Sequence, residues 1–424
     1  MDVYAGRSVT REDQQLDAPV TFIEAACPRW DTDAGHGWSA LDRRLDTYEQ
    51  AVDALQGALR SCICPRVDGA QDVGNACSRL LVLSRRIGSP SADAEVYETV
   101  VLPREPLADA ADPFAQTTGE GVRMAVKVLA FVGDDSAARN NTEMGIAQAA
   151  SGLVRAGVSP YFPLVYGTTY CDAVAYAPGS LLGAAARDYD LRQQVVEAAP
   201  PARRRQVRAL VRTAPDLASL SETIASYGLG DIVEGGLDPS RPLPAHLLVS
   251  EMAWGDLSSV AARIPLTADQ WFGIVHGVLS AIGTLQSHLS VVHNDLHFGN
   301  VLVAVAATNG DNDDDGDDAT PRARCPLALL PLVHDFGRSY KAEVWMADDR
   351  TRDAEKVIEG LLSRDVPPPV RAAAERLDQL VSTLHTRDYV MDDIVDAWDR
   401  FAAEARAADA RLGGTLWHAP VSPL

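Results

Sequence analysis

The residues best suited to chemistry lie in the segment Val291–Val303, which reads VVHNDLHFGNVLV. The carboxylate of Asp295 is expected on a turn after a short apolar strand, and the carboxamide of Asn300 opens the next strand five residues later. A further apolar strand ends in the triplet Asp335–Gly337 (DFG). Oxygen ligands at neighbouring strand ends can hold Mg²⁺, which leaves Asp295 to face an incoming hydroxyl group.

Lys127 adds a cation to this set, because Met124–Lys127 (MAVK) lies in an apolar stretch typical of a strand. An ammonium group there could bind phosphate as a point charge. Only three of the 38 basic residues are Lys. A basic side chain needed only for solvation would therefore almost always be Arg in this chain, and Lys127 is a candidate phosphate ligand.

In order and spacing these motifs resemble those of the protein-kinase-like superfamily over roughly residues 78–365. Asp295 and Asn300 match the catalytic-loop Asp and Asn, Asp335–Gly337 matches the DFG triplet, and Lys127 matches the Lys of V-A-I-K. The resemblance implies ATP and Mg²⁺ as cofactors. It makes Asp295 the catalytic base, Asn300 and Asp335 the metal ligands, and Lys127 a phosphate-binding residue.

The resemblance also implies the remaining site residues. Glu143, the only Glu between Lys127 and Tyr170, matches the helical Glu that pairs with the strand Lys. Residues 87–97 match the glycine-rich loop and the strand after it, although only the first Gly is kept, and residues 247–257 match the hinge. The implied nucleotide-binding residues are Ile87, Gly88, Val96, Ala125, Lys127, Glu251, Ala253 and Asp256. The alternatives are an ordinary hairpin at 87–97, a solvated Glu143 and a solvated turn at Asp256.

Three departures from the protein-kinase pattern bear on the acceptor. The triplet His293–Asp295 lacks the Arg that in many kinases reads a phosphorylated activation loop. The sequence DLHFGN resembles aminoglycoside and choline phosphotransferases and kinase-like proteins of large DNA viruses. No A-P-E follows DFG, and only residues 338–352 separate Gly337 from Asp353, at an expected helix start behind the catalytic loop. The peptide-docking platform is therefore expected to be short or absent.

The preferred function from sequence is ATP-dependent phosphorylation of Ser or Thr in a protein. The first alternative is a small-molecule phosphotransferase, which the DLHFGN motif and the short activation segment favour. The second is a pseudokinase or interaction module, which the altered glycine loop favours. The expected partner is accordingly a protein or small-molecule hydroxyl acceptor.

The implied fold is α+β and bilobal, with a small antiparallel-sheet N-lobe and a mainly helical C-lobe that enclose the nucleotide. We expect an N-terminal extension with one amphipathic helix at 1–77, an N-lobe at 78–252 and a C-lobe at 253–424. The N-lobe includes a helical insertion at 172–244, and the C-lobe includes an acidic loop at 308–324.

Hydrophobic periodicity predicts the individual elements. Strands are expected at 79–102, 122–132, 161–166 and 246–252, and on both sides of the catalytic loop from Val291. Helices are expected at 38–60, 136–154, after the N-cap Thr267, and at 353–363, 370–386 and 390–412.

Composition excludes other classes of protein. The net charge of −21, from 59 acidic and 38 basic residues, disfavours binding to nucleic acid or an anionic membrane. Apolar runs are too short to span a bilayer and no secretion signal is present, so we expect an intracellular, cytoplasmic protein, or a host-cytoplasmic or virion protein if the source is viral. Cys62, Cys64 and Cys77 lack the second pair of a zinc site and are expected to be reduced thiols.

The acidic loop gives a first testable prediction. Segment 308–324 holds six Asp and two Arg, so it cannot bury apolar surface and is expected to be solvated. Trypsin should therefore cut the native chain first at Arg322 or Arg324, as mass spectrometry of the early fragments would report. Resistance at both bonds would mean that the loop is docked.

Overall fold

The computed structural model describes residues 44–45, 47–53, 55, 66–67, 82–83, 85–87, 94–101, 122–174, 176, 179–230, 237–305, 329–384 and 391–411. These residues form two compact units. The sheet unit comprises residues 50–140 and 166–250, and the helical unit comprises residues 1–49, 141–165 and 251–424. The fold is α+β, in agreement with the class expected from sequence.

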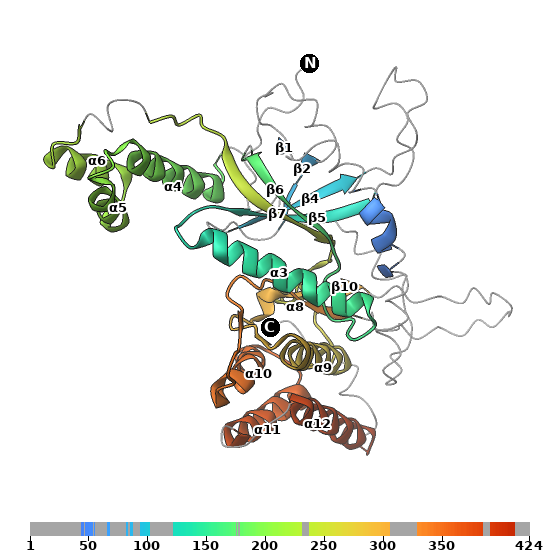
Figure 1. Ribbon diagram of the computed structural model, residues 1–424. Coiled ribbons are helices and arrows are strands. Elements are labelled where there is room, and N and C mark those ends of the chain that lie inside the picture. Colours follow the sequence, from blue (N-terminus) through green and yellow to red (C-terminus); the bar gives the residue numbers. More distant parts are fainter. Residues whose placement is uncertain are drawn as a thin grey trace, which may run out of the picture. The chain divides into compact units, whose positions relative to one another are not determined.

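The sheet unit contains a five-stranded antiparallel sheet in the order β3-β4-β5-β7-β6 (Figure 1). Its strands are β3 (Arg85–Ile87), β4 (Glu95–Val101), β5 (Val122–Ala130), β6 (Val165–Val174) and β7 (Leu243–Glu251). A separate parallel pair joins β1 (Arg66–Val67) to β2 (Val82–Leu83). The strands predicted at 79–102, 122–132 and 246–252 are confirmed in position, since each of these ranges contains or overlaps an observed strand.

The strand predicted at 161–166 is wrong in its bounds, because β6 begins only at Val165 and runs to Val174. Before Val165, several backbone groups of residues 160–164 bind side chains or residues outside the five-stranded sheet. The Tyr161 carbonyl accepts the Val333 N–H at 2.9 Å, and the Leu164 N–H donates to the Glu251 carboxylate at 2.8 Å. Pro163 has no N–H to offer. The sequence pattern did not reveal these contacts.

Three helices form most of the predicted insertion: α4 (Leu181–Ala198), α5 (Arg204–Thr213) and α6 (Leu217–Ser226). The predicted helical range was too wide, since residues 172–174 belong to β6 and β7 begins at Leu243. The helices share a hydrophobic cluster of their own, formed by Val195, Val196, Ala199, Val207, Val211, Leu220 and Ile224.

Two of the contacts between this insertion and the rest of the sheet unit differ sharply in their burial. At the start of α4, the N-cap Ser180 donates its hydroxyl to Glu95 at 2.9 Å, and the Glu95 side chain is fully buried. On α5, Arg212 forms an ion pair with Asp134 at 2.5 Å, and both side chains are about half exposed, at 63% and 46%. One anchor is thus buried and the other is solvated.

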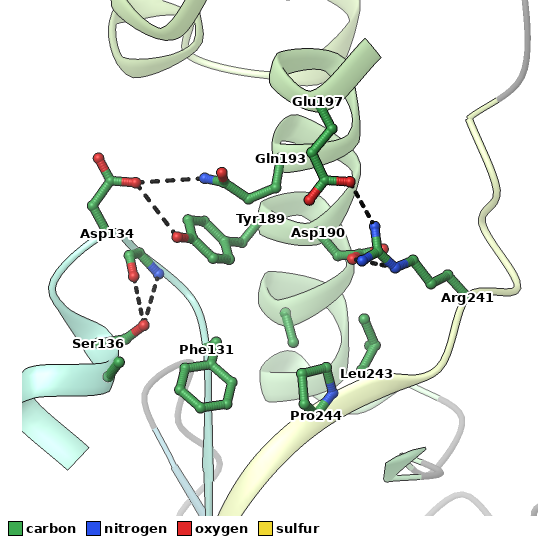
Figure 2. Close-up of a pocket in the computed structure, with 13 residues that line it drawn as sticks. Phe131, Asp134, Ser136, Tyr189, Asp190, Gln193, Glu197, Arg241, Leu243 and Pro244 are labelled. Carbon is green, nitrogen blue, oxygen red and sulfur yellow. Dashed lines mark hydrogen bonds and ion pairs between the residues drawn. The ribbon is translucent and has the colours of Figure 1, made fainter. Parts of the chain in front are cut away.

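A cavity of about 260 Å³ lies between α4, the turn after β5 and the first residues of β7 (Figure 2). Its charged lining side chains are paired with each other or with nearby arginines: Arg241 contacts Glu197 at 3.1 Å and Asp190 at 3.7 Å. Phe131, Leu243 and Pro244 supply an apolar wall. The cavity is therefore part of the packing between the insertion and the sheet.

The helical unit is organised around α9 (Ala268–Thr284), which begins with a capping box between Thr267 and Gln270 as its N-cap was predicted to allow. The other helices are α8 (Leu257–Arg263), α10 (Ala347–Leu362), α11 (Pro368–Leu384) and α12 (Met391–Arg411) (Figure 1). The Trp398 indole on α12 is fully buried and donates to the Phe272 carbonyl of α9 at 3.0 Å. Helix α3 (Ser136–Arg155) starts in the sheet unit and continues into the helical unit.

Short strands complete the helical unit. β10 (Val301–Val305) pairs with β11 (Leu329–Val333) and with β8 (Gly255–Asp256), whereas β9 (Val291–Val292) pairs with β12 (Tyr340–Lys341). The predicted strand, turn and strand from Val291 are confirmed. Of the predicted N-terminal helix, the described residues between 44 and 55 are helical.

Cys171 is the one cysteine within the described residues, and the expectation of reduced thiols at Cys62, Cys64 and Cys77 did not concern it. It is fully buried on β6 and disulfide-bonded. The remaining cysteines lie outside the described residues, including Cys62, Cys64 and Cys77. In the described part of the chain, no helix has both the length and the apolar character needed to cross a membrane.

Gly277 on α9 generates a test of the packing in the helical unit. A Cβ at this buried position would lie 2.6 Å from Cγ of Pro331 on β11 and 2.8 Å from Cε1 of Tyr161. Gly277→Ala should lower the free energy of unfolding by about 1–3 kcal/mol through overpacking. Gly145→Ala, at an exposed position of α3 with nothing within 4 Å of the added Cβ, should raise it by roughly 0.5–1 kcal/mol. Urea unfolding followed by tryptophan fluorescence would measure both, and equal effects would contradict the packing assigned to Gly277.

Candidate active site

A buried carboxylate anchors the loop that carries Asp295. Asp353 on α10 is fully buried, and its two oxygens accept the backbone N–H groups of His293 and Asn294 at 2.7 and 2.8 Å. Burial raises the pKa of the Asp353 carboxyl, while His293 and the two N–H donors act in the opposite direction. The helix that the sequence predicted behind the catalytic loop thus holds the loop directly.

The backbone of this loop turns through a left-handed residue immediately before Asp295. Asn294 has φ 65°, a conformation that Asn tolerates better than most residues. Its side chain is held on both sides, because Nδ2 donates to the Arg338 carbonyl at 3.2 Å and Oδ1 accepts from Arg352 at 2.9 Å. The orientation of Asp295 is therefore set by a backbone that is fixed on either side of Asn294.

Asp295 and Asn300, predicted from the D-x4-N spacing, lie together. The Asn300 side chain is buried and donates from Nδ2 to the Asp295 carbonyl at 2.9 Å. With Nδ2 used in this way, the amide oxygen Oδ1 is the atom left to bind a ligand. The Asp295 carboxylate is one third exposed and lies 3.6 Å from the guanidinium of Arg338.

The hairpin register brings Asp335 to the same place. Strands β10 and β11 are antiparallel with Val301 opposite Val333, and the His334 N–H donates to the Asn300 carbonyl at 3.1 Å. Asp335 is the next residue, at the same end of the hairpin as Asn300. A carboxylate and an amide are thereby placed at neighbouring strand ends, and their role as metal ligands stays a prediction.

Glu143 reaches the DFG triplet. Its side chain is buried, and a Cβ built on Gly337 would lie 3.2 Å from Oε2 of Glu143 and 3.3 Å from Oδ1 of Asp335. Asp335 itself has φ 64°, the second left-handed residue of the site. Glycine at position 337 therefore allows two carboxylates to approach the backbone closely.

Phe336 and Ser339 pack against the loop that carries Asp295. The Phe336 side chain is buried, with its ring centroid 5.3 Å from that of His293. His293 donates from Nε2 to the His334 carbonyl at 2.8 Å, and its own carbonyl accepts the Ser339 hydroxyl at 3.0 Å. The DFG triplet and the catalytic loop are therefore joined through His293.

The predicted nucleotide-binding residues of the sheet unit share one face of the sheet. Ile87 pairs with Val96, and Val96 pairs with Lys127, so the three side chains form a row across β3, β4 and β5. Ala125 precedes Lys127 by two residues and lies on the same face. All four are partly exposed, whereas Met124 and Val126 on the opposite face are fully buried. The result is an apolar platform with one ammonium group. Gly88 lies outside the described residues.

The predicted hinge residues have structural contacts of their own. The Glu251 carboxylate is bound by Arg44 and by the Leu164 N–H, so only its main chain could face an adenine edge. Ala253 is half-buried. Asp256 caps α8, where its two oxygens accept the Ser259 N–H and hydroxyl at 2.9 and 2.7 Å. A role for Asp256 toward a ribose remains a prediction.

Lys127 lies in the sheet unit, whereas Glu143, Asp295, Asn300 and Asp335 lie in the helical unit. Among the residues that the structure describes, no three His, Cys, Asp or Glu side chains are grouped so that they could hold a metal ion by themselves.

Comparison with known proteins found no matching family model and no curated protein that matches the chain.

Sequence reasoning missed the contacts of three residues. It placed Asp353 at a helix start but gave it no role, and it assigned nothing to Arg338 or Arg44. The one available signal for Asp353 was an acidic residue in an otherwise apolar helix face, DAEKVIEGL. Arg44 and Arg338 carry no signal, because 35 of the 38 basic residues are Arg.

The anchoring role of Asp353 can be tested by Asp353→Asn. An amide offers one acceptor oxygen, so at least one of the two buried N–H groups loses its partner and faces an NH₂ group. We expect the free energy of unfolding to fall by about 2–4 kcal/mol and hydrogen exchange at residues 293–295 to accelerate. Asp365→Asn, at an exposed position just after α10, is the matched control and should change neither quantity. Unchanged exchange in Asp353→Asn would contradict the anchoring role of Asp353.

Proposed function

We propose that the chain is an ATP-dependent phosphotransferase of the protein-kinase-like type, with the sheet unit as its N-lobe and the helical unit as its C-lobe. The observation that supports this most strongly is a set of hydrogen bonds. They join the loop of Asp295 and Asn300 to the segment before the DFG triplet and to Asp353 on α10. Asn300 bonds to Asp295 on one side and to His334 on the other, and Asp353 fixes the turn before Asp295. Motifs that coincided by chance would have no reason to meet in this way.

The donor set fits the proposed cation. Mg²⁺ prefers oxygen ligands and is commonly held by one or two carboxylates together with substrate phosphates and water. Asp335 supplies a carboxylate and Asn300 an amide oxygen, since the Asn300 nitrogen is already bonded to Asp295. When bound, the cation would neutralise charge on the phosphates.

Each residue then has one task. Lys127 binds phosphate oxygens, and the platform of Ile87, Val96 and Ala125 contacts the base. Glu143 corresponds to the helical Glu of the family that the chain resembles, and the segment from Glu251 to Ala253 offers its main chain to the adenine edge. Asp295 accepts or orients the proton of the attacking hydroxyl, which in phosphoryl transfer is mostly a matter of position and charge.

The preferred acceptor is a Ser or Thr side chain of a protein, and the alternative is a small-molecule alcohol. One structural observation favours the alternative: only residues 338–346 separate Gly337 from the start of α10, and β12 ties this segment to β9. Parallel assays with labelled ATP and either a generic protein or aminoglycoside and choline acceptors would distinguish them.

The catalytic assignment is tested by two substitutions. Asp295→Asn keeps the shape but removes the negative charge and the basic oxygen, so transfer should fall about 10²–10⁴-fold while Mg-ATP affinity stays within a few-fold. Lys127→Ala should weaken both, because an ammonium group binds phosphate in the ground state as well. Turnover and nucleotide dissociation constants would be measured for both variants.

The wild-type chain provides the control for this test. Saturating Mg-ATP should raise its melting temperature, because a ligand that binds only the folded state stabilises it. Full activity in the Asp295→Asn variant would exclude Asp295 as the base. Mg-ATP binding without transfer to any acceptor would favour the pseudokinase alternative.

A further inference from the structure

Arg44, in the N-terminal helix before the sheet unit, makes more contacts than an arginine on a solvated helix surface would make. Its guanidinium donates to both oxygens of Glu251, from Nε at 3.0 Å and from Nη2 at 2.5 Å. It also donates to the carbonyls of Pro160 and Phe162, both at 2.6 Å. Four bonds thus join residue 44 to two segments more than one hundred positions away in sequence.

The ion pair is largely removed from solvent. The Arg44 and Glu251 side chains are only 11% and 10% exposed. A buried charge that loses its partner is strongly unfavourable, so each side chain needs the other. Glu251 also accepts the Leu164 N–H at 2.8 Å, and the Glu251 N–H donates to the Leu164 carbonyl at 2.9 Å.

The two segments held by Arg44 lead directly to proposed site residues. Residues 160–164 follow α3, the helix that carries Glu143, and Glu251 immediately precedes the segment that reaches Ala253. A second contact fixes the same helix end, because the guanidinium of Arg155 at the end of α3 lies 5.4 Å from the ring centroid of Tyr48. The N-terminal helix therefore holds α3 and the end of β7 together.

The chemistry of this contact requires Arg. Two carboxylate oxygens and two carbonyls need four N–H donors in a fixed planar arrangement, which a guanidinium has and a single ammonium does not. Lys could retain the charge but not all four bonds. The effect of Arg44→Lys should thus lie between those of the wild type and of an uncharged variant.

We propose that Arg44 is a positioning residue for nucleotide binding, through which the N-terminal helix clamps α3 and the Glu251–Ala253 segment. This rests on the proposed function. The clamp gives the N-terminal segment, which has no counterpart in the family that the chain resembles, a task within the catalytic unit. Arg44 touches neither nucleotide nor acceptor in this proposal and acts through Glu251 and the backbone of residues 160–164.

The test uses the full chain with Arg44→Met, Arg44→Lys and the control Arg205→Met, which removes an exposed arginine from α5. All proteins are studied well below their melting temperatures, so that each is folded. Arg44→Met should weaken Mg-ATP binding by about tenfold, Arg44→Lys by less, and Arg205→Met not at all. Hydrogen exchange at residues 160–165 and 250–254 should accelerate in the same order.

A double-mutant cycle with Glu251→Gln separates the clamp from general destabilisation. If the two side chains act as one contact, Arg44→Met and Glu251→Gln together should weaken nucleotide binding no more than either alone. Folded Arg44→Met protein with wild-type nucleotide affinity would overturn the proposal, as would additive effects in the cycle.

Failure of the proposed function would look different. A wild-type chain that binds no Mg-ATP would overturn the phosphotransferase assignment and, with it, the nucleotide part of this proposal. Hydrogen exchange needs no nucleotide, so unchanged exchange at 160–165 in Arg44→Met would independently overturn the clamp itself.

Discussion

The candidate site depends on one buried carboxylate, that of Asp353. A buried carboxylate is tolerable only when hydrogen-bond donors surround it, and Asp353 obtains two from the backbone of His293 and Asn294. These bonds fix the left-handed turn that presents Asp295. From there the contacts continue through Asn300 into the β10–β11 hairpin, and so to Asp335.

The segment after Gly337 relies on the same loop. Ser339 bonds to the His293 carbonyl, β12 pairs with β9, and the Tyr340 hydroxyl donates to Asp349 at 2.5 Å. Arg352 then joins Tyr340 to Asn294. Strand pairing and side-chain hydrogen bonds to the loop and to α10 thus order this short segment without a long platform of additional residues.

How far sequence could predict this arrangement depended on the distance between partners along the chain. Local patterns gave the strand at Lys127, the helix at Glu143 and the cap at Thr267, because period, propensity and capping act within a few residues. The D-x4-N spacing and the following DFG strand predicted that Asp295, Asn300 and Asp335 would lie together. By contrast, the Arg44–Glu251 pair spans 207 positions and the Asp353–His293 bond spans 60, so no local pattern encodes them. The start of β6 was misjudged for the same reason, since distant partners bind the backbone of residues 160–164.

Two contacts of the helical insertion, Ser180–Glu95 and Asp134–Arg212, differ in their exposure to water, and salt therefore acts on them differently. Mobile ions screen the half-exposed Asp134–Arg212 pair but do not reach the buried Ser180–Glu95 bond. Raising the ionic strength should therefore weaken the ion pair at α5, while the first turn of α4 keeps its bond to Glu95. The internal cluster of α4, α5 and α6 is apolar and is not weakened by screening. The three helices should therefore stay packed against one another at high salt, even where α5 has lost its ion pair with Asp134.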